Sequence, residues 1–219
     1  MANYILVHGG NMSAETWNRL TKGKPYKTAD GRMGGMIWDP VTAVLEAKGH
    51  RCFAPTLKDE HSNDLTENIG EISSIITDND LKEVVLAGHS YGGMVITGTA
   101  AKFPDRVKHM VYVDAALPSP GQSLFDIIKG QGVDPLSFAG LEADPPYVEQ
   151  IQFDPKKIKD TPKTYIRCTK SDFAVVTQAA KKIIDAEPKS WTYLELPSSH
   201  VPMAEMPEEL TKILLDAAK

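Results

Sequence analysis

Short apolar runs alternate with longer amphipathic segments along the whole chain, and this alternation limits the folds that the chain can adopt. Because the apolar runs are almost continuous, they favour strands that are buried on both faces of a mainly parallel sheet. Six runs have the length and composition of such strands: 4–7, 51–56, 83–88, 107–113, 164–169 and 191–196.

The segments between these runs carry helical patterns. One begins at Asp39-Pro40, a good N-cap followed by a proline that suits the first helical turn, and closes at Lys48-Gly49. Others cover 65–76, 94–103 and 210–217. Regular strand–helix alternation predicts an α/β fold with a twisted, mainly parallel sheet and helices on both faces. A chain of 219 residues fits one domain, 1–219.

Two regions interrupt the alternation. Segment 11–37 is rich in turn-forming Gly, Pro and Asp, and we expect a long loop there, near the site. Segment 117–162 is rich in Pro and Gly and carries one short helical candidate near 123–129. Because loops at the carboxyl ends of parallel strands build the sites of such sheets, we expect 117–162 to form a small cap.

The charge balance argues against polyanionic partners. The net charge is -5 and the basic residues are dispersed, so we expect no nucleic-acid partner and no membrane partner. No apolar stretch reaches the roughly 20 residues that cross a bilayer. The first residues lack the pattern of a signal peptide, which favours a cytoplasmic protein. Cys52 and Cys168 lie in apolar runs, and we expect both to be reduced, buried thiols.

A candidate nucleophile follows the third apolar run. Gly88-His89-Ser90-Tyr91-Gly92-Gly93 contains Gly-x-Ser-x-Gly between a predicted strand and a predicted helix. A serine on such a turn has its hydroxyl lifted above the sheet, and the flanking glycines leave room for the strained backbone. The pattern therefore predicts Ser90 as a nucleophile; the alternative is a glycine-rich turn that binds an anion or nothing.

A serine hydroxyl needs a base, and histidine is the usual one near neutral pH. Of the six histidines, only His109 and His200 follow Ser90, as the order of this motif requires. His109 lies within a strand pattern and fits a core or strand-edge position. His200 lies in a loop between the last strand and the last helix, so we predict it as the base. His8 and His89 are expected to be structural.

The acid that orients the base has two candidates. Asp172 follows the strand run 164–169, the expected place, and is the first choice. Asp114 ends the preceding strand run and is the alternative. A third possibility is that Asp172 only caps the helix after it.

An oxyanion needs two donors aimed at it. The backbone N–H of Tyr91, directly after the nucleophile, is one candidate. The N–H of Gly10, in the loop after the first strand, is the other.

With these residues identified, the chain resembles the α/β-hydrolase superfamily over nearly its full length. More narrowly, it is similar to the branch of plant methylesterases, hydroxynitrile lyases and bacterial salicylate-esterase or pyrethroid-hydrolase-like proteins. The residues that carry the resemblance are His8-Gly9-Gly10, Trp38, Gly49-His50, Gly88-His89-Ser90-Tyr91-Gly92-Gly93-Met94-Val95, Val111-Tyr112-Val113-Asp114-Ala115 with Pro118 and Gly121-Gln122-Ser123, Thr164-Tyr165-Ile166-Arg167-Cys168-Thr169, and His200 with Met203 and Pro207.

The resemblance implies an α/β-hydrolase fold and ester hydrolysis through Ser90, Asp172 and His200, without cofactor or metal. Two departures bear on it. Segment 11–37 is longer than this branch usually shows, which would reshape the mouth of the site. Gly9 and Val201 stand where the lyases carry Thr and Lys, and this favours hydrolysis over lyase chemistry.

The sequence thus predicts a serine esterase that cleaves a small-molecule carboxylic ester through an acyl-enzyme, as a monomer or homodimer. Two alternatives stay open: a hydroxynitrile-lyase-type or other carbonyl lyase, and a non-catalytic ligand-binding protein on the same fold. We also expect that removing most of 11–37 would alter substrate preference more than stability.

Overall fold

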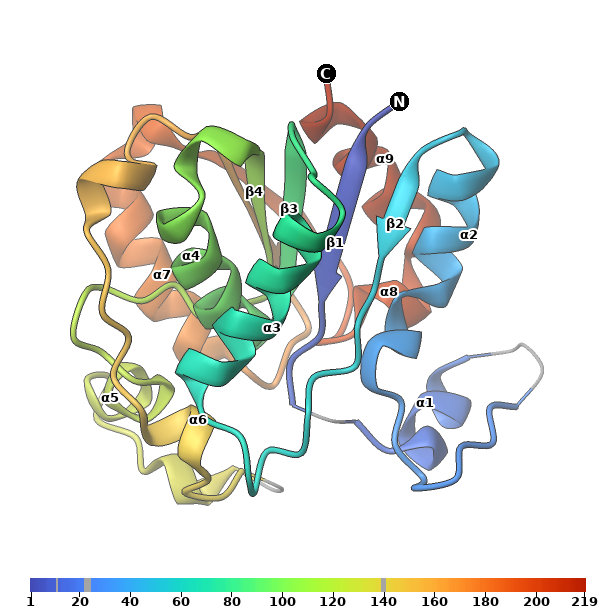
Figure 1. Ribbon diagram of the computed structural model, residues 1–219. Coiled ribbons are helices and arrows are strands. Elements are labelled where there is room, and N and C mark those ends of the chain that lie inside the picture. Colours follow the sequence, from blue (N-terminus) through green and yellow to red (C-terminus); the bar gives the residue numbers. More distant parts are fainter. Residues whose placement is uncertain (11, 22–24, 139–140) are drawn as a thin grey trace.

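The computed structural model describes residues 1–10, 12–21, 25–138 and 141–219. Its centre is a six-stranded sheet in which every neighbouring pair is parallel (Figure 1). The strand order is β2-β1-β3-β4-β5-β6. The predicted parallel α/β architecture is confirmed. The strands are β1 (Asn3–Val7), β2 (Arg51–Phe53), β3 (Val84–His89), β4 (Val107–Val113), β5 (Lys163–Cys168) and β6 (Thr192–Leu196).

The strand order reverses in the middle of the sheet. The chain runs outward from β1 to β2, returns across β1 to β3, and then continues in the other direction through β4, β5 and β6. Val7 pairs with Gly88, and His89 pairs with Val113, so the loops after β1, β3 and β4 leave the sheet side by side. Sheets of this kind bind ligands beyond the carboxyl ends of the strands at such a reversal.

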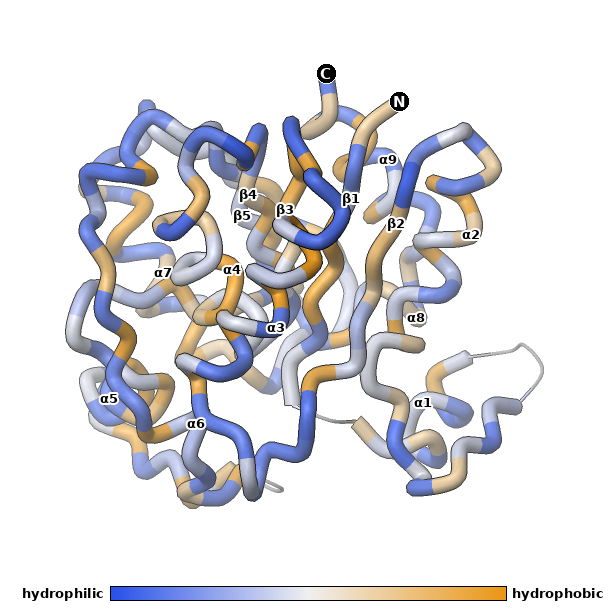
Figure 2. The backbone as a smooth tube through the Cα atoms, in the orientation of Figure 1, coloured by the Kyte–Doolittle hydropathy of each residue, from blue (hydrophilic) through white to orange (hydrophobic). Residues whose placement is uncertain are grey.

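Helices cover both faces of the sheet because successive strand residues point to opposite sides. Ile5 and Val7 belong to one core cluster, while Tyr4 and Leu6 belong to the other. In Figure 2 the apolar colour concentrates in the strands and on the inward sides of the helices. The first cluster packs against α3 (Leu65–Asp78), α4 (Gly92–Lys102) and α7 (Ala174–Ala186); the second packs against α2 (Asp39–Ala47), α8 (Pro202–Glu205) and α9 (Pro207–Ala217).

Segment 11–37 is more structured than the expected long loop. It contains α1 (Ala14–Leu20), and it ends within the 3-10 helix η1 (Gly34–Trp38). Ser13 begins α1 by accepting a hydrogen bond from the Thr16 N–H at 3.1 Å. Trp17 and Met33 are fully buried in the second core cluster. The loop expectation is therefore wrong for these parts of the segment, while Asn11 and residues 22–24 lie outside the described residues.

The part of segment 117–162 that carries α5 (Leu124–Lys129) and α6 (Pro145–Val148) lies beyond the carboxyl ends of the strands, at the bottom of Figure 1, and the chain then returns along the side of the molecule to the start of β5. Ser123 and Asp126 form a reciprocal capping box that starts α5, close to the helix expected at 123–129. Residues 139–140 lie outside the described part of the segment. Its other elements are the 3-10 helices η3 (Pro135–Ser137) and η4 (Pro155–Ile158).

The remaining features concern the surface and the thiols. Two further 3-10 helices are η2 (Pro104–Arg106) and η5 (Pro188–Ser190).

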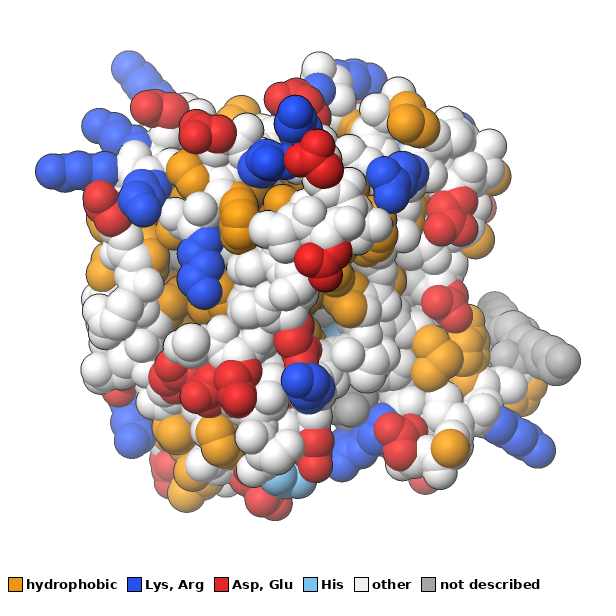
Figure 3. Space-filling view, in the orientation of Figure 1, with side chains coloured by type: hydrophobic (Ala, Val, Ile, Leu, Met, Phe, Trp, Pro, Cys, Tyr) orange, Lys and Arg blue, Asp and Glu red, His pale blue; other side chains and the backbone are white. Residues whose placement is uncertain are grey.

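Cys168 is buried, Cys52 is half-buried, and both are free thiols. No helix among the described residues is long and apolar enough to cross a membrane. Acidic and basic side chains are interspersed over the face drawn in Figure 3.

Candidate active site

Ser90 sits on a strained turn between β3 and α4. Its φ is +56°, a value that non-glycine residues rarely adopt. The two flanking glycines allow the turn: a Cβ on Gly88 would lie 2.5 Å from the Gly92 carbonyl oxygen, and a Cβ on Gly92 would lie 2.7 Å from the Val7 carbonyl oxygen. The Gly-x-Ser-x-Gly pattern is therefore the packing requirement of a turn that crosses closely over the end of β1.

Ser90 opens into a cavity of about 570 Å³ beyond the carboxyl ends of the strands. The walls come from the Ser90 turn, the loops after β1, β2, β5 and β6, and segments 11–37 and 117–162. Ser90 and His200 both lie in the wall, as do Gly10, Tyr91 and Asp172. The other lining residues are Met12, Ser13, Thr16, Arg32, Ile37, Glu60, His89, Leu124, Phe138, Leu141, Tyr147 and Phe173.

His200 is held by Asp114. Its Nδ1 lies 2.7 Å from Asp114 Oδ2, and Asp114 Oδ1 accepts a second bond from the Cys168 N–H at 2.8 Å. The Asp114 carboxylate is fully buried. Burial alone would raise its pKa, but the hydrogen bonds from His200, Ser171 and Cys168 outweigh burial and hold the pKa below its usual value. An ionised Asp114 keeps the proton of His200 on Nδ1, which leaves Nε2 as the basic nitrogen.

The predicted contact between Asp172 and the imidazole of His200 is not found among the described residues; His200 bonds Asp114 instead. Asp172 is exposed on the turn after β5 and lies on the cavity rim. Two residues before it, the Lys170 N–H donates to the Ser198 carbonyl oxygen, so this turn lies against the loop that leaves β6. Asp114 directly follows β4, beside the Ser90 turn, and its carboxylate is the one that contacts the imidazole of His200. The alternative that Asp172 caps α7 does not hold either, because the N-cap residue is Phe173.

His89 supports the loop that carries His200. Its Nε2–H donates to the His200 carbonyl oxygen at 2.7 Å, and the two rings lie 4.5 Å apart. Burial lowers the pKa of His89 to about 3, so the ring stays neutral. No hydrogen bond joins Ser90 to His200 within the described residues. Such bonds often tighten only when substrate binds.

His8 and Gly9 shape the loop beside the nucleophile. His8 accepts the Leu57 N–H at Nε2, 2.9 Å away, and donates from Nδ1 to the Gly9 carbonyl at 2.7 Å. These bonds match the structural role expected for His8. A Cβ on Gly9 would lie only 2.4 Å from the Cβ of Ser90. A larger residue at position 9 would therefore have to displace the nucleophile.

Gly10 and Tyr91 both face the cavity, and their surroundings include residues that sequence reasoning missed. A Cβ on Gly10 would lie 3.3 Å from the Tyr147 hydroxyl, which donates to Glu60 at 2.6 Å. Burial and the Glu60 carboxylate raise the pKa of Tyr147, so this hydroxyl remains a donor. Asn68 fixes Tyr91 by donating to its hydroxyl at 3.0 Å. Tyr147 and Glu60 gave no sequence signal because neither belongs to a motif.

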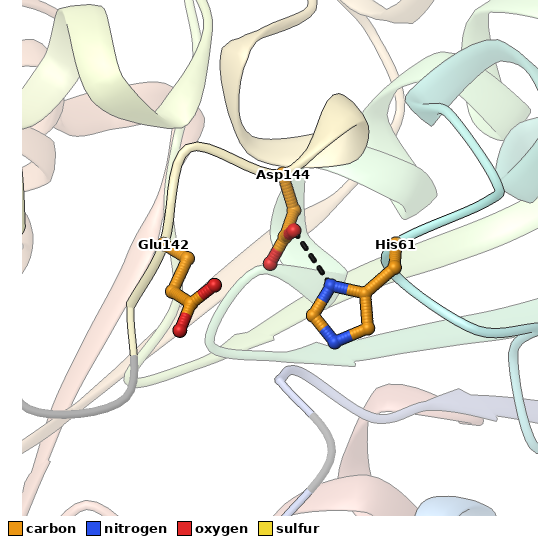
Figure 4. A group of neighbouring side chains, drawn as sticks. All are labelled: His61, Glu142 and Asp144. Atoms are coloured by element: carbon orange, nitrogen blue, oxygen red, sulfur yellow. Dashed lines mark hydrogen bonds and ion pairs between the residues drawn. The ribbon is translucent and has the colours of Figure 1, made fainter.

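One group of side chains near the mouth could hold a metal ion. His61, Glu142 and Asp144 each offer a ligand atom, and these atoms lie within 4.8 Å of one another (Figure 4). His61 Nδ1 already bonds Asp144 at 2.8 Å, and this contact raises the pKa of His61. The group joins the loop before α3 to segment 117–162. We interpret the contact between His61 and Asp144 as an ion pair that holds this segment against the loop before α3.

Comparisons with known proteins find similar proteins that are named as esterases. The chain is 33% identical over 137 residues to the carbendazim hydrolyzing esterase of Nocardioides sp. strain SG-4G, an alignment that covers 58% of this chain and 48% of that protein. It is 34% identical over 125 residues to the polyneuridine aldehyde esterase of Rauvolfia serpentina, covering 56% of this chain and 42% of that protein. The chain thus spans about half the length of these curated relatives.

The fold has close counterparts among solved structures. The pyrethroid hydrolase from Sphingobium faniae JZ-2 superposes with a TM-score of 0.68 at 22% identity, over 99% of this chain and 97% of that one. The profile of the alpha/beta hydrolase family matches residues 4–213, which is almost the entire chain. The chain therefore belongs to the alpha/beta hydrolase family.

Proposed function

We propose that this protein is a serine esterase that hydrolyses small, largely apolar carboxylic esters. One observation carries the proposal: Ser90, on a strained turn, shares a cavity with His200, whose Nδ1 is fixed by the buried Asp114. Nucleophilic catalysis by serine requires these groups: a base in the same cavity as the hydroxyl, and an acid that orients the base. The relatives named as esterases support the same reaction class.

Each step then has a group to perform it. The Ser90 hydroxyl attacks the ester carbonyl while His200 Nε2 takes its proton and Asp114 stabilises the imidazolium. The N–H groups of Gly10 and Tyr91 hold the oxyanion, aided by the start of α4 behind Ser90. His200 returns the proton to the departing alcohol, and a water molecule then attacks the acyl-enzyme. We assign Asp114 and not Asp172 as the acid because of the 2.7 Å contact.

The cavity indicates the substrate class. At about 570 Å³ it suits a small molecule. Segment 117–162 gives it an apolar wall of Leu124, Phe138 and Leu141, and Phe173 closes the side near His200. An ester with an apolar acyl or alcohol part would bury that part against these side chains.

The two alternatives have less support. A lyase of this fold would need the polar groups that Gly9 and Val201 replace, and Gly9 has no room for a side chain beside Ser90. A binding protein would not require the strained φ at Ser90 or the buried, ionised Asp114. Both features carry an energetic cost that a catalytic site explains.

The test is hydrolysis of a series of p-nitrophenyl esters of increasing acyl length. We expect the wild-type protein to turn over the short esters, and Ser90→Ala to lower kcat by about 10⁴-fold or more because no nucleophile remains. Ser74→Ala, which alters an exposed serine on α3, is the matched control and should keep full activity. Equal rates for wild type and Ser90→Ala would contradict the proposal.

A further inference from the structure

A second cavity, of about 650 Å³, lies on the other side of segment 117–162. It is bounded by α4, β4, η4, α7 and the turn that leads into β6. None of its lining residues is shared with the cavity that contains Ser90. It is therefore a separate site on the face of the sheet that α4 and α7 cover.

The floor of this second cavity is apolar. Tyr112 on β4 is fully buried, and Leu117 and Ile158 are nearly so. Trp191 and Ile183 complete the apolar wall. Two buried hydroxyls of the floor, those of Tyr112 and Thr97, bond each other at 2.7 Å. A ligand must therefore bring an apolar body to fill this space.

The rim of the same cavity is basic. Four lysines line it, against the single carboxylate of Glu187. Within the described residues, none of the four has a carboxylate within 4 Å, a departure from a chain whose net charge is -5. Figure 3 shows basic side chains projecting along the edge where η4 and α7 lie. The four are Lys156, Lys159, Lys163 and Lys182.

Lys163 is the rim lysine whose surroundings most favour a bound anion. It is only 8% exposed, and its Nζ donates to the carbonyls of Lys159 and Thr161 at 2.9 and 2.8 Å. An ammonium has three donors, so one N–H has no hydrogen-bond partner among the described residues. Its Nζ also lies 5.8 Å from the centre of the Trp191 ring. Burial lowers the pKa of Lys163 although the carboxylates of Asp160 and Glu187 act to raise it, so these two carboxylates offset the cost of burying the charge only in part.

We propose that this second cavity binds an amphiphilic carboxylate, a ligand with an apolar body and a single carboxylate group. The body would lie against Tyr112, Ile183 and Trp191, and the carboxylate would accept the open donor of Lys163 within the field of the other three lysines. A small inorganic anion would leave the apolar floor empty. A neutral apolar molecule would leave the buried ammonium without a carboxylate in hydrogen-bond contact.

Trp191 gives a local readout, because the other two tryptophans, Trp17 and Trp38, lie in the second core cluster. The probes are sodium decanoate, 1-decanol and sodium acetate, titrated at fixed ionic strength while tryptophan fluorescence is recorded. Decanoate should give a saturable change that is absent in Trp191→Phe. Decanol should bind about tenfold or more weakly, which is the value of a charge-assisted hydrogen bond. Acetate should give no response.

Lysine variants test the charged rim. Lys159→Gln/Lys182→Gln alters two exposed rim residues and should weaken decanoate binding about tenfold. Lys48→Gln/Lys212→Gln, which removes two exposed lysines near the other face of the sheet, is the matched control and should bind as the wild type does. Unfolding curves confirm that each variant is folded.

Three results would overturn the proposal: no fluorescence response to decanoate, equal affinity for decanoate and decanol, or an affinity that the rim variant leaves unchanged. Calorimetric binding of decanoate without a Trp191 response would place the ligand elsewhere and would also overturn it. The readout is binding and not turnover, so the outcome is independent of the esterase proposal.

Discussion

Ser90 and Asp114 share a backbone feature at the carboxyl edge of the sheet. Each directly follows a central strand, and each has a positive φ, +56° and +47°. The two turns are bonded to each other, since the Ala116 N–H donates to the Ser90 carbonyl at 2.9 Å. Strained residues of this kind persist only where the surrounding structure fixes them, and they cluster at functional sites.

Substitution of the two aspartates tests which one serves His200. Asp114→Asn should lower kcat by about 10³- to 10⁴-fold, because an amide neither selects the Nδ1–H tautomer nor stabilises the imidazolium. Asp172→Asn is the matched control and should keep kcat close to that of the wild type, since this exposed carboxylate makes no bond to His200 in the described chain. Steady-state kinetics on a p-nitrophenyl ester measures both. A large loss in Asp172→Asn with near-normal Asp114→Asn would restore the sequence-based assignment.

At this scale the sequence predicts some residues and not others. Ser90 follows from a motif in its required context, and His200 follows from chain order. The order Ser, acid, His is satisfied by both Asp114 and Asp172, so it does not choose between them. The choice depends on how far each turn extends beyond its strand, which is a tertiary property.

The helix α1 shows how tertiary packing overrides the composition of a segment. Turn-forming residues around it predicted a loop, yet Trp17 and Met33 are fully buried, and Ile37 nearly so. We therefore no longer expect that removing most of 11–37 would spare stability, because the deletion would open the second core cluster.

Trp17→Ala tests this corrected view. Loss of a fully buried tryptophan should lower the free energy of unfolding by about 3–5 kcal/mol, because the cavity left behind closes only in part. Glu15→Ala, at an exposed position on the same helix, is the matched control and should change it by less than about 0.5 kcal/mol. Urea unfolding followed by circular dichroism measures both. Equal midpoints would mean that α1 is only a surface element.

Elements with strong periodicity were the easiest to predict. The apolar runs predict the strands, and all except β2 match within one residue at each end, although the edge strands β2 and β6 are only partly buried. β2 ends three residues earlier than its apolar run, just before Ala54-Pro55, because proline has no N–H for a strand ladder. Helix α7 was missed, although Val176, Ala180 and Ile184 carry its buried spacing.

For the molecule as a whole, buried neutral histidines make stability depend on pH. Burial lowers the pKa of His8 to about 4 and that of His89 to about 3, against about 6.5 in an unfolded chain. Between these values the unfolded chain binds more protons than the folded one. The free energy of unfolding should therefore be highest above pH 6.5 and fall as the pH drops toward 4.

The expected loss attributable to His8 alone is about 3 kcal/mol once the pH reaches its folded pKa. Urea unfolding at a series of pH values from 7 down to 4.5 measures the slope. His8→Gln cannot titrate and should reduce this slope. His50→Gln, at a less buried histidine whose pKa burial also lowers, should reduce the slope by less than His8→Gln does. A wild-type protein whose stability does not change over this range would contradict the buried, neutral state of these rings.

If Ser90 is an activated nucleophile, it should react covalently with an electrophile that targets such serines. The protein is treated with a fluorophosphonate, which modifies only activated serines, and the site of modification is read by peptide mass spectrometry. We expect one adduct, on the peptide that contains Ser90, with much slower labelling in His200→Ala and none in Ser90→Ala. No adduct on the folded protein, or an adduct on another serine, would contradict it.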